Sequence, residues 1–180
     1  MKFIDFHETN PDLREAVWKL YEDSFPEHER RSRTAQSMAF GNSGSHGRIA
    51  IGDEGELLAL LFYWIEGDIL YVEFLAVNPQ MRGRNLGSRI VERLLELYPD
   101  KLVILEIEPP EDEMTVRRLN FYRRLGFQPN DYEYTHPSYH TGEKAHPHPL
   151  TIMSHGRTLS QNEFDRFKAF IDGVILSYKD

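Results

Sequence analysis

The chain has 180 residues, enough for one domain with its own hydrophobic core. The 29 Asp and Glu outnumber the 21 Lys and Arg, and the net charge of −8 argues against a protein that grips nucleic-acid phosphates. The lack of cysteine excludes disulfides, thiolate metal sites and a cysteine nucleophile. The longest apolar run, 57–65, is too short to span a bilayer, and the N-terminus lacks a signal-like apolar core. We therefore expect a cytoplasmic protein.

The first half of the chain predicts a strand, two helices and three strands. Asn10 is a favoured helix cap and Pro11 a favoured first helical residue, so they mark the start of the first helix. Glycines at 41–47 indicate a flexible loop. In chain order the expected elements are a strand at 2–6, helices at about 11–25 and within 27–40, and strands at 48–51, 57–65 and 69–77. The last two strands should form a hairpin.

The second half predicts alternating helices and strands. Pro99 and Gly126 end two of the helices, and Ser160 with Glu163 has the spacing of a capping box. The expected elements are a helix from 86 to about 98, a strand at 102–107, a helix at about 112–125, strands from 127 and at about 149–154, and a helix at 160–178. A segment rich in Tyr, His and Pro, 132–148, separates the last strands. This order indicates an α/β (α+β) fold with a mixed sheet.

The stretch with the clearest chemistry is 77–88, VNPQMRGRNLGS, between a buried strand and an amphipathic helix. Residues 77–91 contain three arginines and no acid, and Gly83 and Gly87 let the backbone approach a ligand. A strand-to-helix turn presents unpaired N–H groups at the positive end of the helix. The stretch thus predicts a phosphate- or pyrophosphate-binding loop, with a solvated basic helix start as the alternative.

This stretch resembles the acyl-CoA pyrophosphate loop of the GNAT N-acetyltransferase superfamily, [RQ]-x-x-G-x-[GA]. Arg82 matches the first position and Gly87 the last, while Asn85 replaces the middle glycine. Asparagine suits that position because it adopts positive φ more readily than most residues. The blocks FYRRLGF at 121–127 and LEI at 105–107 are similar to two further family blocks, in family order and spacing. Many members have Asn where this chain has Thr115.

The resemblance implies a GNAT fold, with a mostly antiparallel mixed sheet and helices on both faces. It implies a single domain over 1–180, with a CoA-binding core at about 69–128 and a C-terminal helix at about 160–178. Strands 69–77 and 102–107 would splay apart to admit the pantetheine arm of acetyl-CoA. The implied cofactor-binding residues are Leu75, Ala76, Val77, Arg82, Gly83, Arg84, Asn85, Leu86, Gly87, Ser88 and Tyr122.

The implied activity is transfer of an acetyl group from acetyl-CoA to a primary amine by direct attack. An amine with a pKa near 10.4 is neutral in roughly 1 molecule in 2,500 at pH 7, so a base is useful. Glu106 is the first candidate, Glu73 the second, and a water chain is a further route. Strand alternation would put Glu73 on the same face as Leu75 and Val77. Either carboxylate could instead be a structural partner inside the sheet.

The other steps of the transfer also have candidates. The Val77 N–H would stabilise the oxyanion. Tyr122 would donate a proton to the departing thiolate, or would simply be a core aromatic residue. Direct attack, without an acyl-enzyme, agrees with the lack of cysteine.

Several features leave other functions open. The chain could be a non-catalytic acyl-CoA sensor or interaction module, because Asn85 and Thr115 depart from the family pattern. Histidines in 136–155 could bind a metal, but the prolines among them favour a loop, and we expect no metal. The charge run 27–31 reads as a solvated face, although the family's loop there helps shape the acceptor site. We expect a small-molecule or protein amine as acceptor, no nucleic acid or membrane partner, and a possible homodimer.

Overall fold

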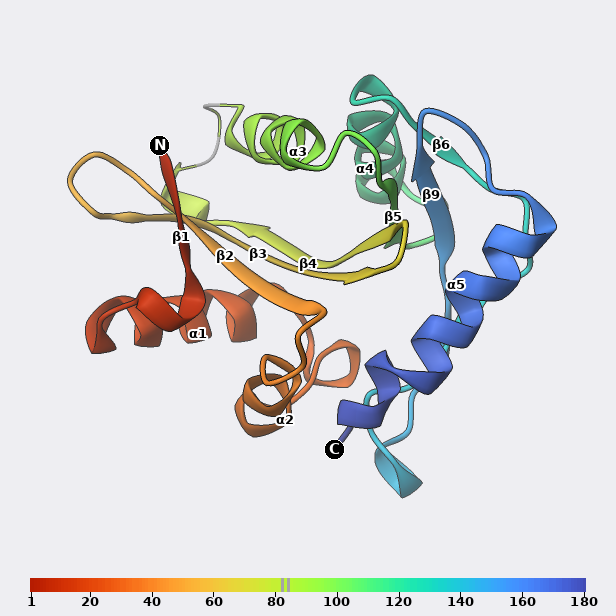
Figure 1. The fold of residues 1–180 in the computed structure, drawn as a ribbon, viewed down its shortest axis with the longest axis horizontal. Helices are drawn as coiled ribbons and strands as arrows, with labels where there is room; N and C mark the ends of the chain where they lie inside the picture. Colours follow the sequence, from red (N-terminus) through yellow and green to blue (C-terminus); the bar gives the residue numbers. More distant parts are fainter. Residues whose placement is uncertain (82, 84) are drawn as a thin grey trace.

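The computed structural model of the chain describes residues 1–81, 83 and 85–180 (Figure 1). A seven-stranded sheet has the order β1-β2-β3-β4-β5-β9-β6. Neighbouring strands are antiparallel, except that β4 and β5 run parallel. The strands are β1 (Lys2–Asp5), β2 (Ser45–Ile51), β3 (Leu57–Glu66), β4 (Ile69–Val77), β5 (Leu102–Ile107), β6 (Phe127–Pro129) and β9 (Thr151–His155). The predicted mixed, mostly antiparallel sheet and the β3–β4 hairpin are confirmed.

Helices cover both faces of this sheet (Figure 1). The helices are α1 (Pro11–Ser24), α2 (Arg33–Ala39), α3 (Leu86–Leu97), α4 (Glu113–Arg124) and α5 (Gln161–Gly173). The predicted caps are present: the Asn10 side chain accepts from the Leu13 N–H at the start of α1, and Ser160 and Glu163 form a capping box on α5. Among these described helices, none is long and apolar enough to cross a membrane.

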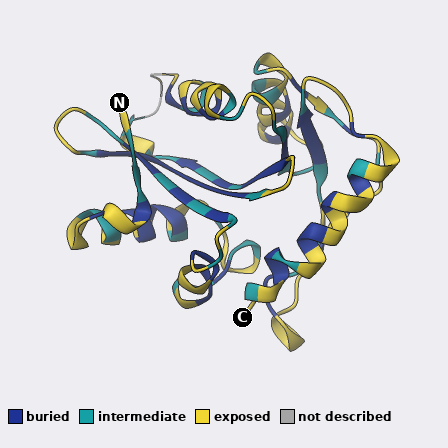
Figure 2. Ribbon diagram, in the orientation of Figure 1, coloured by how far each residue is buried: buried dark blue, intermediate teal, exposed yellow. Residues whose placement is uncertain are grey.

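Each face of the sheet has its own hydrophobic core (Figure 2). The core under α1, α2 and α5 is aromatic, and the core under α3 and α4 is mostly aliphatic. Representative members of the first are Trp18, Tyr21, Phe62, Phe74, Phe167 and Phe170. Representative members of the second are Leu61, Leu70, Ile90, Leu94, Val103 and Leu105. Because strand side chains alternate between faces, β3 and β4 contribute to both cores.

Four segments differ from their predicted structure. The helix predicted at about 160–178 is in two parts, because α5 ends at Gly173 and a separate 3₁₀ helix spans Ile175–Tyr178. Helix α2 is shorter than expected, because Ser32 caps it at Arg33 and a separate 3₁₀ helix, Glu27–Glu29, precedes it. The glycine-rich stretch 41–47 is not all loop, since β2 begins at Ser45 and pairs with β3. Gly47 permits this, because a Cβ there would lie 2.9 Å from Phe6 and 3.1 Å from Phe40.

The segment rich in Tyr, His and Pro also contains structure that the sequence did not predict. Strands β7 (Thr135–His136) and β8 (His148–Pro149) pair as a short antiparallel hairpin, with His136 opposite His148. The connecting residues reach the α1–α2 connection, where His140 Nε2 lies 2.8 Å from the Glu27 carbonyl. This hairpin therefore forms part of the wall beside β4 and β5.

Candidate functional site

A cleft opens where β4 and β5 diverge. The strands pair in parallel from Ile69 and Leu102 as far as Val72 and Leu105, and in the described chain the pairing ends there. The cleft has a volume of about 630 Å³. Its lining includes all three predicted catalytic side chains, Glu73, Glu106 and Tyr122, together with the predicted pantetheine-binding residues Leu75, Ala76 and Val77.

Backbone N–H groups of β4 point into this cleft. The Asn78 N–H donates to the Leu58 carbonyl across β3 (2.8 Å). Because consecutive N–H groups in a strand point to opposite edges, those of Val77 and Leu75 point away from β3, towards β5. Past Val72 these donors face the gap between the diverging strands, where an extended ligand can accept them as a further strand would.

A β-bulge places Glu73 on the aromatic face of the sheet. The register of β3 against β4 shifts between Phe62 and Tyr63, so that Tyr63 pairs with Val72 and Phe62 with Phe74. Glu73 is the extra residue, and strand alternation breaks there. The expectation that Glu73 shares a face with Leu75 and Val77 is therefore wrong, because those two pack in the opposite core while Glu73 contacts the aromatic one.

The Glu73 carboxylate is fully buried and fully engaged. Its Oε1 accepts from Arg31 Nη1 (2.8 Å) and from the Tyr139 hydroxyl (2.9 Å), and its Oε2 accepts from Trp64 Nε1 (2.8 Å). Burial, and then the charge of Glu73, raise the pKa of Tyr139 well above its usual value, so that hydroxyl keeps its proton. Glu73 thus has partners on both oxygens.

Arg31 is the residue of the charge run 27–31 that sequence reasoning placed wrongly. Its side chain is completely buried rather than solvated. Besides Glu73, it donates to Gln36 Oε1 (3.0 Å) and to the Ile175 carbonyl (2.8 Å), and its guanidinium lies 4.6 Å from the Tyr139 ring centre. A buried guanidinium needs such partners, and the one that carries the opposite charge lies 42 positions away in sequence.

Glu106 lies on the adjacent strand β5 and accepts fewer hydrogen bonds than Glu73. Its side chain is 6% exposed. Oε2 accepts from the Tyr71 hydroxyl (2.6 Å), whereas the buried Oε1 has no hydrogen-bond partner among the described residues. His136 Nε2 lies 3.9 Å from Oε2. Glu106 therefore combines a buried carboxylate with a free acceptor oxygen, which the geometry of Glu73 does not offer.

Tyrosines surround the Glu106 carboxylate and stay protonated. Burial, and then the negative charge of Glu106, raise the pKa of both Tyr71 and Tyr134 above the usual value. Sequence reasoning did not single out these tyrosines or His136 for catalysis. The high histidine content of 132–148 could have indicated catalytic groups there. The prolines instead favoured a loop, and the histidines were weighed only as metal ligands.

Tyr122 reaches the cleft from α4. Its ring packs against Phe121 and Phe127, with ring centres 5.0 and 5.7 Å away. Burial raises the pKa of Tyr122 to about 12, with Arg118 acting in the opposite direction. The hydroxyl therefore carries its proton at neutral pH and can donate it. Thr115, the departure from the family pattern on the same helix, forms a capping box with Asp112.

The glycine-containing loop leads into α3, as predicted. Asn85 has φ of 53°, so it occupies the left-handed region that its position in the motif requires. Gly83 is also left-handed, with φ of 85°. A Cβ at Gly87 would lie 3.3 Å from Phe121, so glycine lets α3 approach α4 closely. The Leu86, Gly87 and Ser88 amides belong to the first turn of α3, which has no side-chain cap. Arg82 and Arg84 lie outside the described residues.

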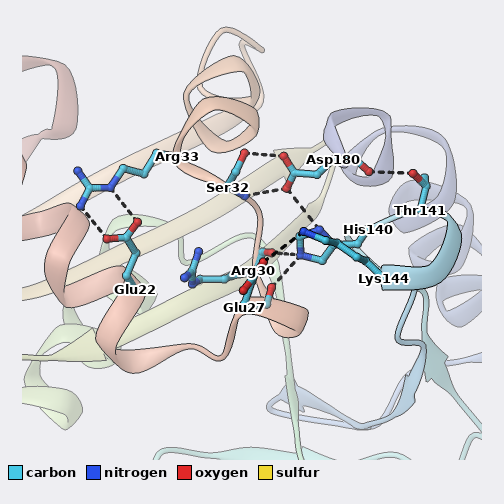
Figure 3. A pocket seen from close by; sticks show the side chains of 9 residues that line it. All are labelled: Glu22, Glu27, Arg30, Ser32, Arg33, His140, Thr141, Lys144 and Asp180. Carbon is cyan, nitrogen blue, oxygen red and sulfur yellow. Dashed lines mark hydrogen bonds and ion pairs between the residues drawn. The ribbon is translucent and has the colours of Figure 1, made fainter.

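A second pocket, of about 510 Å³, lies between the α1–α2 connection and the loop after β7 (Figure 3). Its charged groups pair with one another. Arg33 donates to Glu22, Ser32 donates to Asp180, and His140 lies 3.8 Å from Asp180. These polar groups therefore already have partners, in contrast to Glu106 Oε1 in the cleft.

A metal site does not emerge from the histidines. Within the described chain, no group of three or more His, Asp or Glu side chains is placed to hold a metal ion. His140 contacts backbone carbonyls of the α1–α2 connection, and His155 packs against Phe127 on β9. His140 and His155 therefore lie apart from His136, His146 and His148, whose rings neighbour one another.

Comparison with known proteins identifies the fold and its family. Residues 10–127 match the model of the acetyltransferase (GNAT) family. Among curated proteins, the candidate acetyltransferase YjbC of Bacillus subtilis is 33% identical over 78 residues. That match covers 42% of this chain and only 39% of YjbC.

Solved structures extend the likeness to nearly the whole chain. A candidate GNAT acetyltransferase from Bacteroides thetaiotaomicron superposes with a TM-score of 0.85 at 27% identity, covering 98% of each chain. An aminoglycoside 6'-N-acetyltransferase in complex with coenzyme A superposes with a TM-score of 0.61 at 16% identity, covering 86% of this chain and 96% of its own. At 16% identity, the match to the aminoglycoside 6'-N-acetyltransferase shows a shared fold.

Proposed function

Since this chain belongs to the GNAT family of acetyltransferases, whose cosubstrate is acetyl-CoA, we propose that it transfers an acetyl group from acetyl-CoA to a primary amine. The observation that carries the proposal is the cleft between β4 and β5. It gathers a carboxylate with a free oxygen (Glu106), a protonated tyrosine (Tyr122) and inward-facing N–H groups of β4. These are the groups that attack of an amine on a thioester requires.

The surroundings of the cleft fit acetyl-CoA. Bound acetyl-CoA supplies the acetyl group in activated form, as a thioester. Leu75, Ala76 and Val77 offer backbone groups to its pantetheine arm, and the amides of 86–88 offer donors to its pyrophosphate at the start of α3. Gly83 and Asn85 supply the turn that aims those donors. We keep Arg82 and Arg84 as proposed charge partners of the pyrophosphate.

We assign the base to Glu106. The acceptor ammonium must lose a proton before it can attack, and Oε1 of Glu106 is free to take it. Glu73 is less suited because both its oxygens are engaged by Arg31, Tyr139 and Trp64. We therefore propose that Glu73 is a positioning residue that anchors the α1–α2 connection to β4.

Tyr122 and Val77 complete the transfer. The Val77 N–H stabilises negative charge on the thioester oxygen as the amine nitrogen bonds to the carbonyl carbon. The carbon–sulfur bond then breaks, and the Tyr122 hydroxyl protonates the departing sulfur. The ammonium nitrogen gives up two protons: Glu106 takes the first, and the second restores the proton that Tyr122 gave to sulfur. Each turnover therefore releases one proton, from Glu106.

The charge around the cleft indicates the class of acceptor. Asp23, Glu29 and Glu108 line it in addition to Glu73 and Glu106, and Arg118, which lines it too, is paired with Glu108. Carboxylates attract an ammonium group and disfavour anionic acceptors. We therefore propose a cationic amine, either a small molecule or an amino group of a protein.

The test is release of free thiol from acetyl-CoA in the presence of polyamines, aminoglycosides, amino acids and lysine peptides. We expect release with at least one cationic amine. With that amine, Tyr122→Phe should lower kcat by about 10-fold to 100-fold and leave KM for acetyl-CoA unchanged, because the hydroxyl acts on the leaving group.

A matched control separates catalysis from folding. Tyr132→Phe removes a hydroxyl that donates to the Leu159 carbonyl, outside the residues that line the cleft. It should retain kcat. Binding of CoA without thiol release from any amine would contradict the proposal and favour a non-catalytic acyl-CoA sensor.

A further inference from the structure

Four buried polar atoms gather beside the proposed base without hydrogen-bond partners in the described chain. They are Glu106 Oε1, the Tyr134 hydroxyl oxygen, and both ring nitrogens of His136. His136 is 2% exposed, and its Nε2 lies 3.9 Å from Glu106 Oε2. Since buried polar groups are almost always paired, a cluster of unpaired ones calls for a functional explanation.

Histidine rings lead from this cluster to the surface. The ring centres of His136 and His148 are 5.8 Å apart, and those of His148 and His146 are 5.9 Å apart. His28, on the α1–α2 connection, continues the row at 4.5 Å from His146. His136 is buried, His148 is half-buried, and His146 and His28 are exposed. Pairing of β7 with β8 fixes His136 opposite His148.

This row meets a need of the reaction. We propose that the histidine row, His136, His148, His146 and His28, carries the proton released in each turnover from Glu106 to solvent. The inference rests on the proposed function, because the proton originates there. Imidazole suits this task because it takes up and releases protons near neutral pH.

Each transfer in the row balances. Because 3.9 Å is too long for a hydrogen bond, protonated Glu106 gives its proton to Nε2 of His136 through a bridging water. Nδ1 of His136 then releases a proton to a second water that bridges to His148. His148 passes a proton on in the same way, directly to bulk water or through His146 and His28. No bond to carbon forms or breaks, and each ring returns to its starting arrangement by rotating, which exchanges the protonated and the unprotonated nitrogen.

The other groups that face the row are poor carriers. Tyr134 and Tyr139 face His136, with ring centres 6.5 and 4.9 Å away, and their raised pKa values keep them protonated. Glu73 is engaged on both oxygens. At the outer end Glu29 lies 3.5 Å from His28. The imidazole rings are therefore the groups of the row that carry the proton.

The kinetic test uses His136→Gln and His148→Gln with the best amine from the thiol-release screen. Glutamine keeps a polar side chain but cannot take up and release a proton near neutral pH. We expect kcat at pH 7 to fall by about 10-fold to 100-fold in His136→Gln and less in His148→Gln, with KM for acetyl-CoA unchanged and partial rescue by added imidazole. His155→Gln, which lies outside the row, should behave like the wild type.

A kcat within about two-fold of the wild type in both variants would overturn the proposal. A loss of kcat that added imidazole rescues in neither variant would overturn it as well. Should His136→Gln fail to fold, His148→Gln decides, because that ring is half-buried at a hairpin.

A second measurement needs no acceptor. In protein with ¹⁵N-labelled histidine, NMR reports how fast the His136 ring N–H exchanges with water. We expect His148→Phe to slow this exchange by about 10-fold or more, because the phenyl ring interrupts the row. An unchanged exchange rate would overturn the row. If the wild type released no thiol with any amine, the proposed function would be overturned instead. The exchange measurement would still show whether protons move along the histidine row.

Discussion

The bulge of β4 and the facing edge of β5 each carry a buried glutamate on the same face of the sheet, but their surroundings differ. Glu73 accepts three hydrogen bonds, one of them from a buried arginine. Glu106 accepts one from Tyr71 and keeps an oxygen unpaired among the described residues. A saturated carboxylate contributes rigidity, whereas an unsaturated one is free to bind a proton or a ligand. Neighbouring strands thus carry one fully hydrogen-bonded carboxylate and one with an oxygen left unpaired among the described residues.

Glutamine at each position gives the sharpest separation of these roles. We expect Glu106→Gln to lower kcat by about 10²-fold to 10⁴-fold, because an amide cannot accept the ammonium proton. Glu73→Gln should leave the folded enzyme within about 10-fold of wild-type kcat. Steady-state kinetics, with circular dichroism to measure the folded fraction, would check both variants. The reverse ranking would make Glu73 the base.

The second effect concerns stability on the Glu73 side. Arg31→Met leaves the Glu73 charge buried beside neutral partners, so we expect the free energy of unfolding to fall by about 3–5 kcal/mol. The double variant Arg31→Met with Glu73→Gln should recover part of this loss, since the unpaired charge is gone. Urea denaturation measures all the variants. Equal losses in the single and double variants would show that packing, not charge, dominates.

Tyrosines near both carboxylates predict an alkaline limit to stability. Their pKa values rise above 10 on folding, and that of Tyr122 rises to about 12. Below pH 10 these tyrosines are protonated in both the folded and the unfolded state, so they add no pH dependence to the free energy of unfolding. Above pH 10 the unfolded chain ionises first, and stability should fall by up to about 1.4 kcal/mol per pH unit for each such tyrosine. Urea midpoints between pH 8 and 11.5 would show this, and Tyr139→Phe should reduce the slope.

The smallest effect belongs to an exposed ion pair on the rim of the same cleft. Glu108 and Arg118 are both more than 40% exposed. Glu108→Gln should change the free energy of unfolding by less than about 1 kcal/mol, because solvent screens the pair. Thermal denaturation would detect it. A loss as large as that of Arg31→Met would remove the contrast between buried and exposed charge.

Local signals in the sequence predicted most of the fold. Asn10, Asp112 and Ser160 cap helices where the pattern placed the helix starts, because capping depends on neighbours within three residues. Asn85 adopts the left-handed backbone expected from its place in the loop. These features depend on a few adjacent residues, which a sequence displays directly.

The parts that escaped prediction depend on distant partners. The bulge at Glu73 is an offset against β3, and strand alternation alone cannot reveal it. Burial of Arg31 depends on Glu73 and on the Ile175 carbonyl, far along the chain. His136 became a site candidate only when the β7–β8 hairpin placed it beside Glu106.

The contacts of Arg31 also indicate at what stage of synthesis the surroundings of Glu73 can form. Its guanidinium donates to the Ile175 carbonyl across 144 positions, so this buried contact can form only after α5 has been translated. Contacts of such high sequence separation slow folding, because much chain entropy is lost before they form. A ribosome-bound chain that ends before α5 would lack this contact, so Arg31 and Glu73 should reach their final arrangement only late in synthesis.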